Sequence, residues 1–270
     1  MNIKDLGQVA SELILYGRPY SNLAALDALY KIASDMNVPP EAMICTGDVV
    51  AYGADPVKTV ELFRSRGGIG IAGNCEKQLA ANAGDCGCGF DAGSTCDVLS
   101  RGWYPYADKA ITPEIRTFFA SLPDVIVFTQ NKRQYAVIHG GMTDISRFVW
   151  PDVQEAVFAA EIKAIQDAVG PIDGVISGHS GIAFERVVNG VHWVNAGVIG
   201  MPEHDGSPDT RYVVLKNGQA SIKKLSYDFV GSATRMNDVG LTQGYDRALI
   251  CGYWPSEAIL PLSMRLGKTA

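Results

Sequence analysis

The chain has 270 residues, of which 47% are hydrophobic and 19% charged. This composition is typical of a globular protein and excludes a disordered chain, a collagen-like repeat and a coiled coil. The formal net charge of −6 argues against a nucleic-acid-binding surface, because affinity for phosphate backbones depends on cations, but it is compatible with a local phosphate pocket.

The N-terminal segment, MNIKDLGQVA, carries acidic and polar residues where a signal peptide needs a basic patch and an apolar run. Apolar stretches elsewhere are about six residues long, far short of the 18 or so that a membrane span needs. Six cysteines in a chain of this length are too few for a secreted disulfide scaffold. We therefore expect a cytoplasmic, thiol-reducing location and no membrane association.

The first third of the chain alternates short apolar runs with amphipathic helical stretches, which is typical of βαβ units that build a largely parallel sheet. One helix begins at Asn22, where apolar residues follow at i, i+3 and i+4 spacing, and ends before Pro39. A second helix follows Pro56 and ends at Gly67. The strands expected in this third are 12–16, 42–46 and 68–72.

The segment 81–102 has neither helical nor strand periodicity and is dense in Gly, Ser, Asp and Cys. We expect it to be a functional loop or a disordered insert, with a Cys-rich part at 84–100. Regular patterns resume after this segment. They predict helices at 112–121 and 153–169 and strands at 125–129, 134–139 and 174–177.

Two Asn-Gly pairs then separate strand-like runs, and Asn-Gly is the strongest short signal for a β-hairpin. The expected hairpins pair 184–188 with 191–194 and 212–215 with 220–225. The segment 228–270 is expected to be a packed but irregular tail. We expect the whole chain, 1–270, to form a single domain in which antiparallel strands extend a parallel unit.

Residues able to bind a metal stand directly after four of the expected strands, the place where α/β sheets hold their ligands. They are Asp48, Asn74, His139 and His179. A single polar residue at the end of a strand is common in turns and helix caps. Four such residues at successive strand ends, including half of the histidines in the chain, predict a metal site. This mixed nitrogen and oxygen set suits a divalent transition metal such as Mn, Fe, Zn or Ni.

The same segments resemble the calcineurin-like metallophosphoesterase superfamily, in particular its small bacterial and archaeal phosphodiesterase branch, over about residues 12–225. That family carries, in order, the motifs DxH, GDxVxxG, GNH followed by an acid, HG, GHxH and NPGSxG. The matching stretches are Gly47-Asp48-Val49-Val50-Ala51-Tyr52-Gly53, Gly73-Asn74-Cys75-Glu76, His139-Gly140, Gly178-His179-Ser180-Gly181 and Asn195-Ala196-Gly197-Val198-Ile199-Gly200. The resemblance implies an α/β fold, a four-layer αββα sandwich of two mixed β-sheets flanked by helices, with metal at the strand ends.

The chain departs from the family at the first-metal motif. The DxH aspartate and histidine become Arg18 and Tyr20, the GNH histidine becomes Cys75, and the last histidine of GHxH becomes Gly181. Family members bind two metals, and three of the four protein ligands of the first metal are missing here. The second-metal set of Asp48, Asn74, His139 and His179 is complete, so the resemblance implies one ion rather than two.

Arg18 offers a replacement for the missing ion. One divalent ion with Asp48 alone has one positive charge fewer than a two-metal site with two aspartates, and Arg18 restores that charge. A guanidinium there would hold two phosphoryl oxygens and stabilise charge on the transferred group. The expected catalytic residues are Arg18, Asp48 and Asn74, although Arg18 is equally compatible with a solvated strand-end cation.

Further candidates carry two interpretations each. Tyr20 either donates a hydrogen bond to substrate or fills the space left by the histidine, and His204 lies in a polar loop that the family places near the metal face. Cys75 is a weak acid in place of the GNH histidine, since a thiol has a pKa of about 8.5. Cys75, Cys86, Cys88 and Cys96 form either a thiolate site for zinc or iron or a set of redox-sensitive thiols.

These expectations describe a metal-dependent phosphoesterase that hydrolyses a small phosphomonoester, phosphodiester or nucleotide with a metal-activated water. Its expected substrate contacts are Arg18, Tyr20, Asn74 and His204. The alternative is a catalytically inactive pseudoenzyme of the same fold that binds a nucleotide, a metal or a partner.

Overall fold

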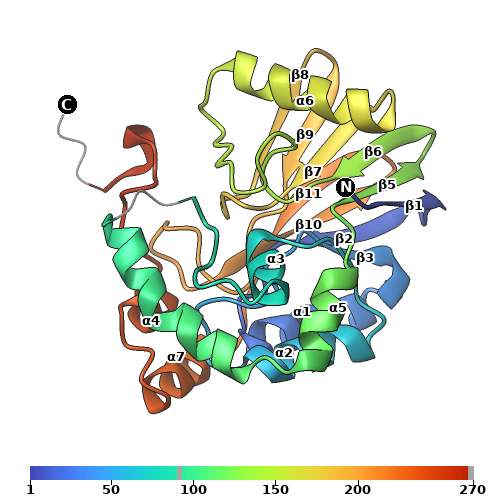
Figure 1. Cartoon of the computed structure of the whole chain (residues 1–270). Helices are drawn as coiled ribbons and strands as arrows, with labels where there is room; N and C mark the ends of the chain where they lie inside the picture. Colours follow the sequence, from blue (N-terminus) through green and yellow to red (C-terminus); the bar gives the residue numbers. More distant parts are fainter. Residues whose placement is uncertain (90–92, 267–270) are drawn as a thin grey trace.

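The computed structural model describes residues 1–89 and 93–266, and its strands form two mixed sheets (Figure 1). The six-stranded sheet contains, in spatial order, β1 (Ile3–Gln8), β5 (Val125–Gln130), β6 (Arg133–Val137), β7 (Gly174–Ser177), β9 (Val191–Asn195) and β8 (Phe184–Val188). The five-stranded sheet contains β11 (Gln219–Leu225), β10 (Thr210–Lys216), β2 (Glu12–Tyr16), β3 (Met43–Cys45) and β4 (Ile69–Gly70).

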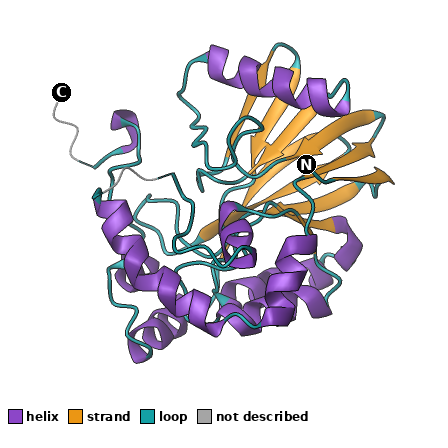
Figure 2. Cartoon of the chain, in the orientation of Figure 1, coloured by secondary structure: helices purple, strands orange, loops and turns teal. Residues whose placement is uncertain are grey.

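Helices cover the outer faces of both sheets, as Figure 2 shows. Helix α6 (Glu155–Val169) lies over the six-stranded sheet, and α1 (Leu23–Asp35), α2 (Pro56–Ser65) and α5 (Pro113–Ser121) lie on the side of the five-stranded sheet. The other helices are α3 (Asn74–Ala80), α4 (Thr95–Ala110), α7 (Phe229–Asp238), α8 (Tyr245–Cys251) and the short 3₁₀ turns η1 (Pro40–Ala42) and η2 (Leu262–Met264). The predicted four-layer αββα sandwich is confirmed.

Strand β5 shows why the sheets need cover on both faces. Val125 and Val127 belong to the core under α6, whereas Ile126 and Phe128 belong to the core between the sheets. Successive side chains of a strand point to opposite faces, so a strand buried on both sides is apolar at nearly every position. This explains why the sequence has continuous apolar runs here instead of an alternating pattern.

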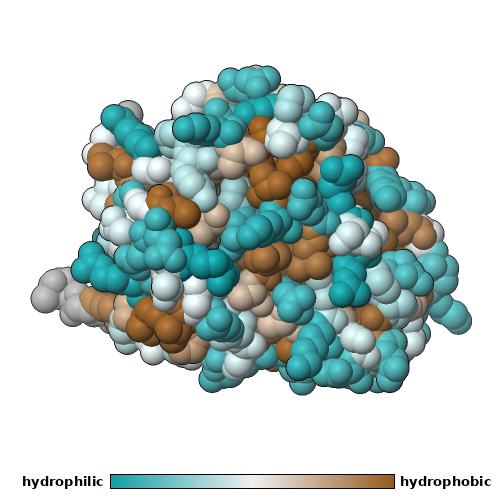
Figure 3. Space-filling model, turned by 90° about the horizontal axis from the view of Figure 1, so that it is seen from below, coloured by the Kyte–Doolittle hydropathy of each residue, from teal (hydrophilic) through white to brown (hydrophobic). Residues whose placement is uncertain are grey.

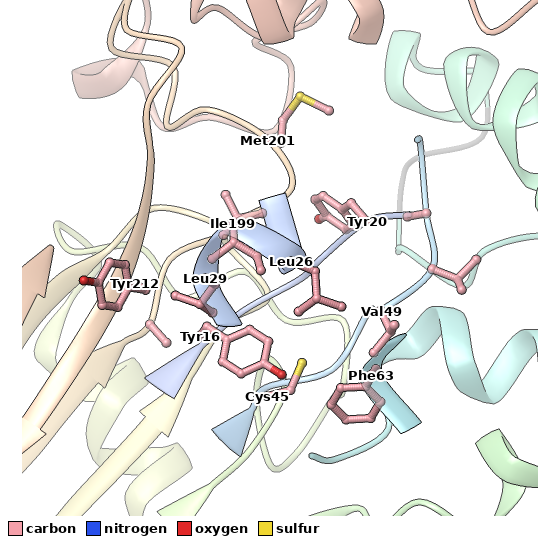
Figure 4. Packing of buried hydrophobic residues seen from close by; sticks show 14 of the residues in the cluster. Tyr16, Tyr20, Leu26, Leu29, Cys45, Val49, Phe63, Ile199, Met201 and Tyr212 are labelled. Carbon is pink, nitrogen blue, oxygen red and sulfur yellow. The ribbon is translucent and has the colours of Figure 1, made fainter. Parts of the chain in front are cut away.

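Parallel pairing brings the chemistry-bearing loops to one edge of the molecule. Strands β2, β3 and β4 are parallel neighbours, and so are β6 and β7. Within each sheet the C-terminal ends of these strands therefore lie at one edge, and the packing of the two sheets brings Asp48 after β3 against His139 after β6. In Figure 4, Leu26 and Leu29 of α1 pack near Ile199 beside the end of β2, and Tyr20 and Met201 lie beyond them.

The predicted hairpins and most of the predicted helices and strands are confirmed, but the segment 81–102 differs. It was expected to lack periodic structure, yet α4 begins at Thr95, where Ser94 caps the helix by accepting from the Asp97 N–H. Gly102 and Pro105 inside α4 disfavour a helix and weaken the sequence signal. Residues 90–92 of the Cys-rich loop 84–100 lie outside the described part of the chain.

The tail also differs from its prediction, because 228–270 contains α7 and α8 instead of irregular structure alone. The buried face of α7 consists of Ser232, Ala233 and Met236, which is too small and polar to produce a clear apolar period. Residues 267–270 lie outside the described residues. Strand β1 was not predicted because it is an edge strand that is mostly exposed. Helix α3 was not predicted because seven residues are too few for a clear helical period.

Exposed apolar side chains are interspersed with polar ones on the face seen in Figure 3. Such dispersed residues are normal on a protein surface. Within residues 1–89 and 93–266, every helix is too short or too polar to cross a membrane.

Candidate metal centre and its cavity

The four predicted metal ligands converge from both sheets. Asp48 follows β3, Asn74 is the first residue of α3 after β4, His139 follows β6, and His179 follows β7. All four side chains are buried, with at most 2% of their surface exposed. Asp48 has a left-handed backbone (φ 55°), a conformation uncommon outside glycine and asparagine, which turns the chain sharply after β3.

The ligand atoms surround one point. The Nε2 atom of His139 lies 3.2 Å from Asp48 Oδ2, 3.0 Å from Asn74 Oδ1 and 2.9 Å from His179 Nδ1. Transition-metal bonds to nitrogen and oxygen are about 2.1 Å long, so two ligands at right angles around one ion lie about 3 Å apart. The spacing of these atoms therefore fits a shared ion.

Hydrogen bonds aim lone pairs at that point. The Nδ1–H of His139 donates to the Thr46 carbonyl (2.6 Å), which leaves a lone pair on Nε2. The Asn74 amide donates through Nδ2 to the Cys86 carbonyl (2.8 Å), which turns its Oδ1 toward His139. Lone pairs that face one another in a buried site are repulsive unless a cation lies among them. The donor set thus fits a divalent metal.

The pKa shifts agree with this assignment. Burial alone would raise the pKa of the Asp48 carboxyl, but His139 and Arg18 outweigh burial and hold this pKa well below its usual range. Burial, together with the positive charge of Arg18, lowers the pKa of His179. The aspartate is thus ionised and His179 is neutral, the protonation states in which both side chains bind metals.

Glu76 holds the loop after β3 that contains Asp48, and this role was not predicted from the sequence. Its carboxylate accepts from the backbone N–H groups of Asp48 (2.7 Å) and Gly73 (2.8 Å), joining the loop after β3 to the start of α3. Burial and the nearby Asp48 charge raise the pKa of Glu76 to about 7. The sequence feature that could have predicted this role is the position of Glu76 three residues after Gly73, which is the spacing of a capping box.

Arg18 lies beside the cluster. Its Nε is 3.4 Å from Asp48 Oδ2, and its Nη1 donates to the His179 carbonyl. A Cβ atom at Gly181, the position that the resemblance aligns with the last histidine of GHxH, would lie 3.2 Å from Nη1. Arg18 and a histidine at position 181 would therefore compete for the same space. The guanidinium also stacks on Tyr20, 4.7 Å from the ring centroid.

A narrow cavity of about 50 Å³ adjoins the cluster, with room for roughly four water molecules. Arg18, His179 and Ser180 line its polar end. Tyr20 lines it too, and burial raises the pKa of the Tyr20 phenol, which therefore keeps its proton. The aromatic walls of the cavity were not predicted from the sequence; they include Tyr52, Phe148, Tyr245 and Trp254. No sequence signal placed these rings together, because they come from four separate segments.

His204 is not among the described residues that line this cavity, and its predicted contact with substrate stays a prediction. Its Nδ1 accepts from the backbone N–H of Trp254 (2.8 Å), and its Nε2 lies 2.7 Å from a Glu257 carboxylate oxygen. Both ring nitrogens are therefore engaged by the tail. His204 positions the cavity wall that carries Trp254.

The cysteines do not form a thiolate cluster in the described part of the chain. Cys86 and Cys88 are joined by a disulfide, and Asp48, His139 and His179 are the one group of three potential ligands found there. Burial raises the pKa of the Cys75 and Cys96 thiols, which keeps both protonated. The redox interpretation of Cys86 and Cys88 stays a prediction.

The disulfide loop supports a ligand, which yields a test. Replacing Cys86 and Cys88 together by serine should loosen the backbone that holds the Asn74 amide. Loss of such a supporting contact weakens metal binding by about 10- to 100-fold. Calorimetric titration with Mn²⁺ should show this loss with an unchanged number of ions per chain, and Cys251→Ser, an exposed free cysteine, is the control. Fewer ions per chain in the double variant would instead make the cysteines ligands.

Comparison with known proteins agrees with this geometry. The model of the calcineurin-like phosphoesterase superfamily domain matches residues 21–218. This range includes all four ligands and begins just after Arg18 and Tyr20. The chain is also 23% identical over 239 residues to an uncharacterised protein of Methanocaldococcus jannaschii, covering 82% of this chain and 89% of that protein.

Two solved structures share the fold. A metallophosphoesterase from Sphaerobacter thermophilus superposes with a TM-score of 0.68 at 18% identity, covering 90% of this chain and 100% of that one. A hypothetical protein from Pyrococcus horikoshii superposes with a TM-score of 0.73 at 14% identity, covering 92% and 99%. At such identities these structures establish the arrangement of sheets and helices alone.

Proposed function

The chain belongs to the calcineurin-like phosphoesterase superfamily, and on that basis we propose that it is a metal-dependent phosphoesterase working with one divalent ion. The observation that carries this proposal is the convergence of Asp48, Asn74, His139 and His179 beside Arg18 and an adjoining cavity. These four residues match the motifs that hold the second metal in the family. In this proposal Arg18 replaces the first metal, because three of that metal's four ligands are missing from the sequence.

A divalent ion held by these four residues would polarise a phosphoryl oxygen and lower the pKa of a water molecule. Arg18 supplies the remaining positive charge. Its Nη1 and Nη2 each carry two N–H groups, and one of the four bonds to the His179 carbonyl. The others remain available to hold two oxygens of a phosphoryl group.

The surrounding residues keep Arg18 in place and charged. Asp48 offsets its charge, and Tyr20 presents the face of its ring to the guanidinium. Burial would lower the pKa of Arg18, but the nearby Tyr20 and Asp48 raise it. The guanidinium is thus preorganised toward the cavity, so little side-chain entropy is lost when a phosphoryl group binds.

Metal-dependent turnover tests the proposal. After treatment with a chelator, the protein should hydrolyse bis(p-nitrophenyl) phosphate only when Mn²⁺, Fe²⁺, Zn²⁺ or Ni²⁺ is restored. Activity should saturate at one ion per chain, because the described residues provide one complete ligand set. Metal binding without turnover under every ion would favour the pseudoenzyme alternative. Saturation at two ions would contradict the replacement of the first metal by Arg18.

A further inference from the structure

The cavity beside Arg18 has two chemically different ends. At one end lie Arg18, His179 and Ser180. Arg18 and His179 offer polar atoms to a phosphoryl group, whereas the Ser180 hydroxyl already donates to the Val149 carbonyl. Away from these three, aromatic and aliphatic side chains dominate the walls, and Tyr52, Tyr245 and Trp254 contribute the largest rings. A ligand that fills this cavity must therefore be charged at one end and apolar at the other.

Charge limits the ligand to a single phosphoryl group. Among the described residues that line the cavity, Arg18 is the one lysine or arginine, and part of its charge already offsets Asp48. A second phosphate or a carboxylate would be held among apolar walls without a cation. Burying an unpaired anion is strongly unfavourable, which disfavours polyphosphates such as nucleoside triphosphates.

Hydrogen bonds hold Trp254 in the cavity wall. Its indole Nε1–H donates to the Pro202 carbonyl (2.6 Å), and its backbone N–H donates to His204 (2.8 Å). Because the indole N–H of Trp254 already donates to the protein, the side chain can offer a ligand only van der Waals and aromatic contact. Tyr52 and Tyr245, with ring centroids 4.2 Å apart, form another part of the same wall.

We infer that the substrate is a phosphoester with one phosphoryl group and an uncharged aromatic substituent, and that Trp254 determines this preference. The inference rests on the proposed function for the phosphoryl end of the cavity. It adds the chemical class of the substituent, which follows from the aromatic and aliphatic lining.

Binding of three phosphonates, which cannot be hydrolysed at the carbon–phosphorus bond, tests the inference independently of turnover. Calorimetry with the metal-loaded protein should give a Kd for phenylphosphonate at least tenfold lower than for methylphosphonate. For 4-carboxyphenylphosphonate, which adds one charge to the same ring, Kd should rise at least tenfold above that of phenylphosphonate. Equal affinity for the methyl and phenyl compounds, tighter binding of the carboxylated one, or no binding of any would overturn the inference.

Variants of the wall locate the preference. Trp254→Ala should raise the Kd for phenylphosphonate about tenfold and leave the Kd for methylphosphonate unchanged. Trp254→Phe, which keeps a ring, should retain most of the preference for phenylphosphonate. Tyr106→Ala, at an aromatic residue of α4 outside the cavity lining, is the control. Equal weakening of all ligands by Trp254→Phe would overturn the role of Trp254. Selective phenyl binding in a protein without turnover would refute the proposed hydrolysis but support the inference.

Discussion

Replacement of Asp48 by asparagine is expected to abolish metal-dependent hydrolysis and to weaken metal binding by more than about 100-fold. Asp48 provides the only carboxylate among the four ligands, and its Oδ2 atom is 3.2 Å from His139 Nε2. Loss of an outer contact alone costs 10- to 100-fold in metal affinity, so loss of the charged ligand should cost more. Calorimetric titration with Mn²⁺ and hydrolysis assays over a range of metal concentrations measure both effects.

The same substitution should destabilise the metal-free protein. Arg18 is buried against Asp48, and removing one partner of a buried ion pair leaves an uncompensated charge that costs about 3–5 kcal/mol. Urea unfolding in the presence of a chelator should therefore show a lower free energy of unfolding for Asp48→Asn than for the wild type. Asp167→Asn, which removes an exposed carboxylate on α6, is the matched control. If Asp48→Asn bound Mn²⁺ with wild-type affinity, Asp48 would not be a metal ligand.

The metal ligands could be predicted from the sequence because local order and sheet topology determine where they lie. Asp48, His139 and His179 each follow a buried apolar strand, and the C-terminal ends of parallel strands in one sheet meet at one edge. Strand pairing therefore places His139 beside His179 in the six-stranded sheet, whereas Asp48 follows a strand of the five-stranded sheet. The expectation that the two sets meet came from the resemblance to the family.

The cavity walls could not be predicted, because they depend on contacts between distant segments. Trp254 reaches the site only because Pro202 and His204, some fifty residues earlier, hold it there. His204 was expected to face a substrate for a good local reason, since it lies in a polar loop near the metal face. Its two nitrogens instead bind the tail, and that partner is invisible in the local sequence.

Replacement of Arg18 by glutamine is expected to lower kcat by about 100- to 1,000-fold and to leave one ion bound per chain. Removal of one preorganised donor to a transition-state oxyanion costs about that much in other enzymes. Metal affinity should be equal to or tighter than that of the wild type, because Arg18 competes with the ion for Asp48 Oδ2, 3.4 Å from its Nε. Steady-state kinetics and Mn²⁺ titration separate the two effects.

Arg18→Lys distinguishes the shape of the guanidinium from its charge. Lysine restores the positive charge but cannot bond to the His179 carbonyl and two phosphoryl oxygens with one planar group. We therefore expect partial recovery over Arg18→Gln and a kcat that stays below the wild-type value. Arg186→Gln serves as a control, since that arginine packs on Phe158 away from the metal ligands. Full activity of Arg18→Gln would contradict a catalytic role for Arg18 and would show that the single metal ion suffices for hydrolysis.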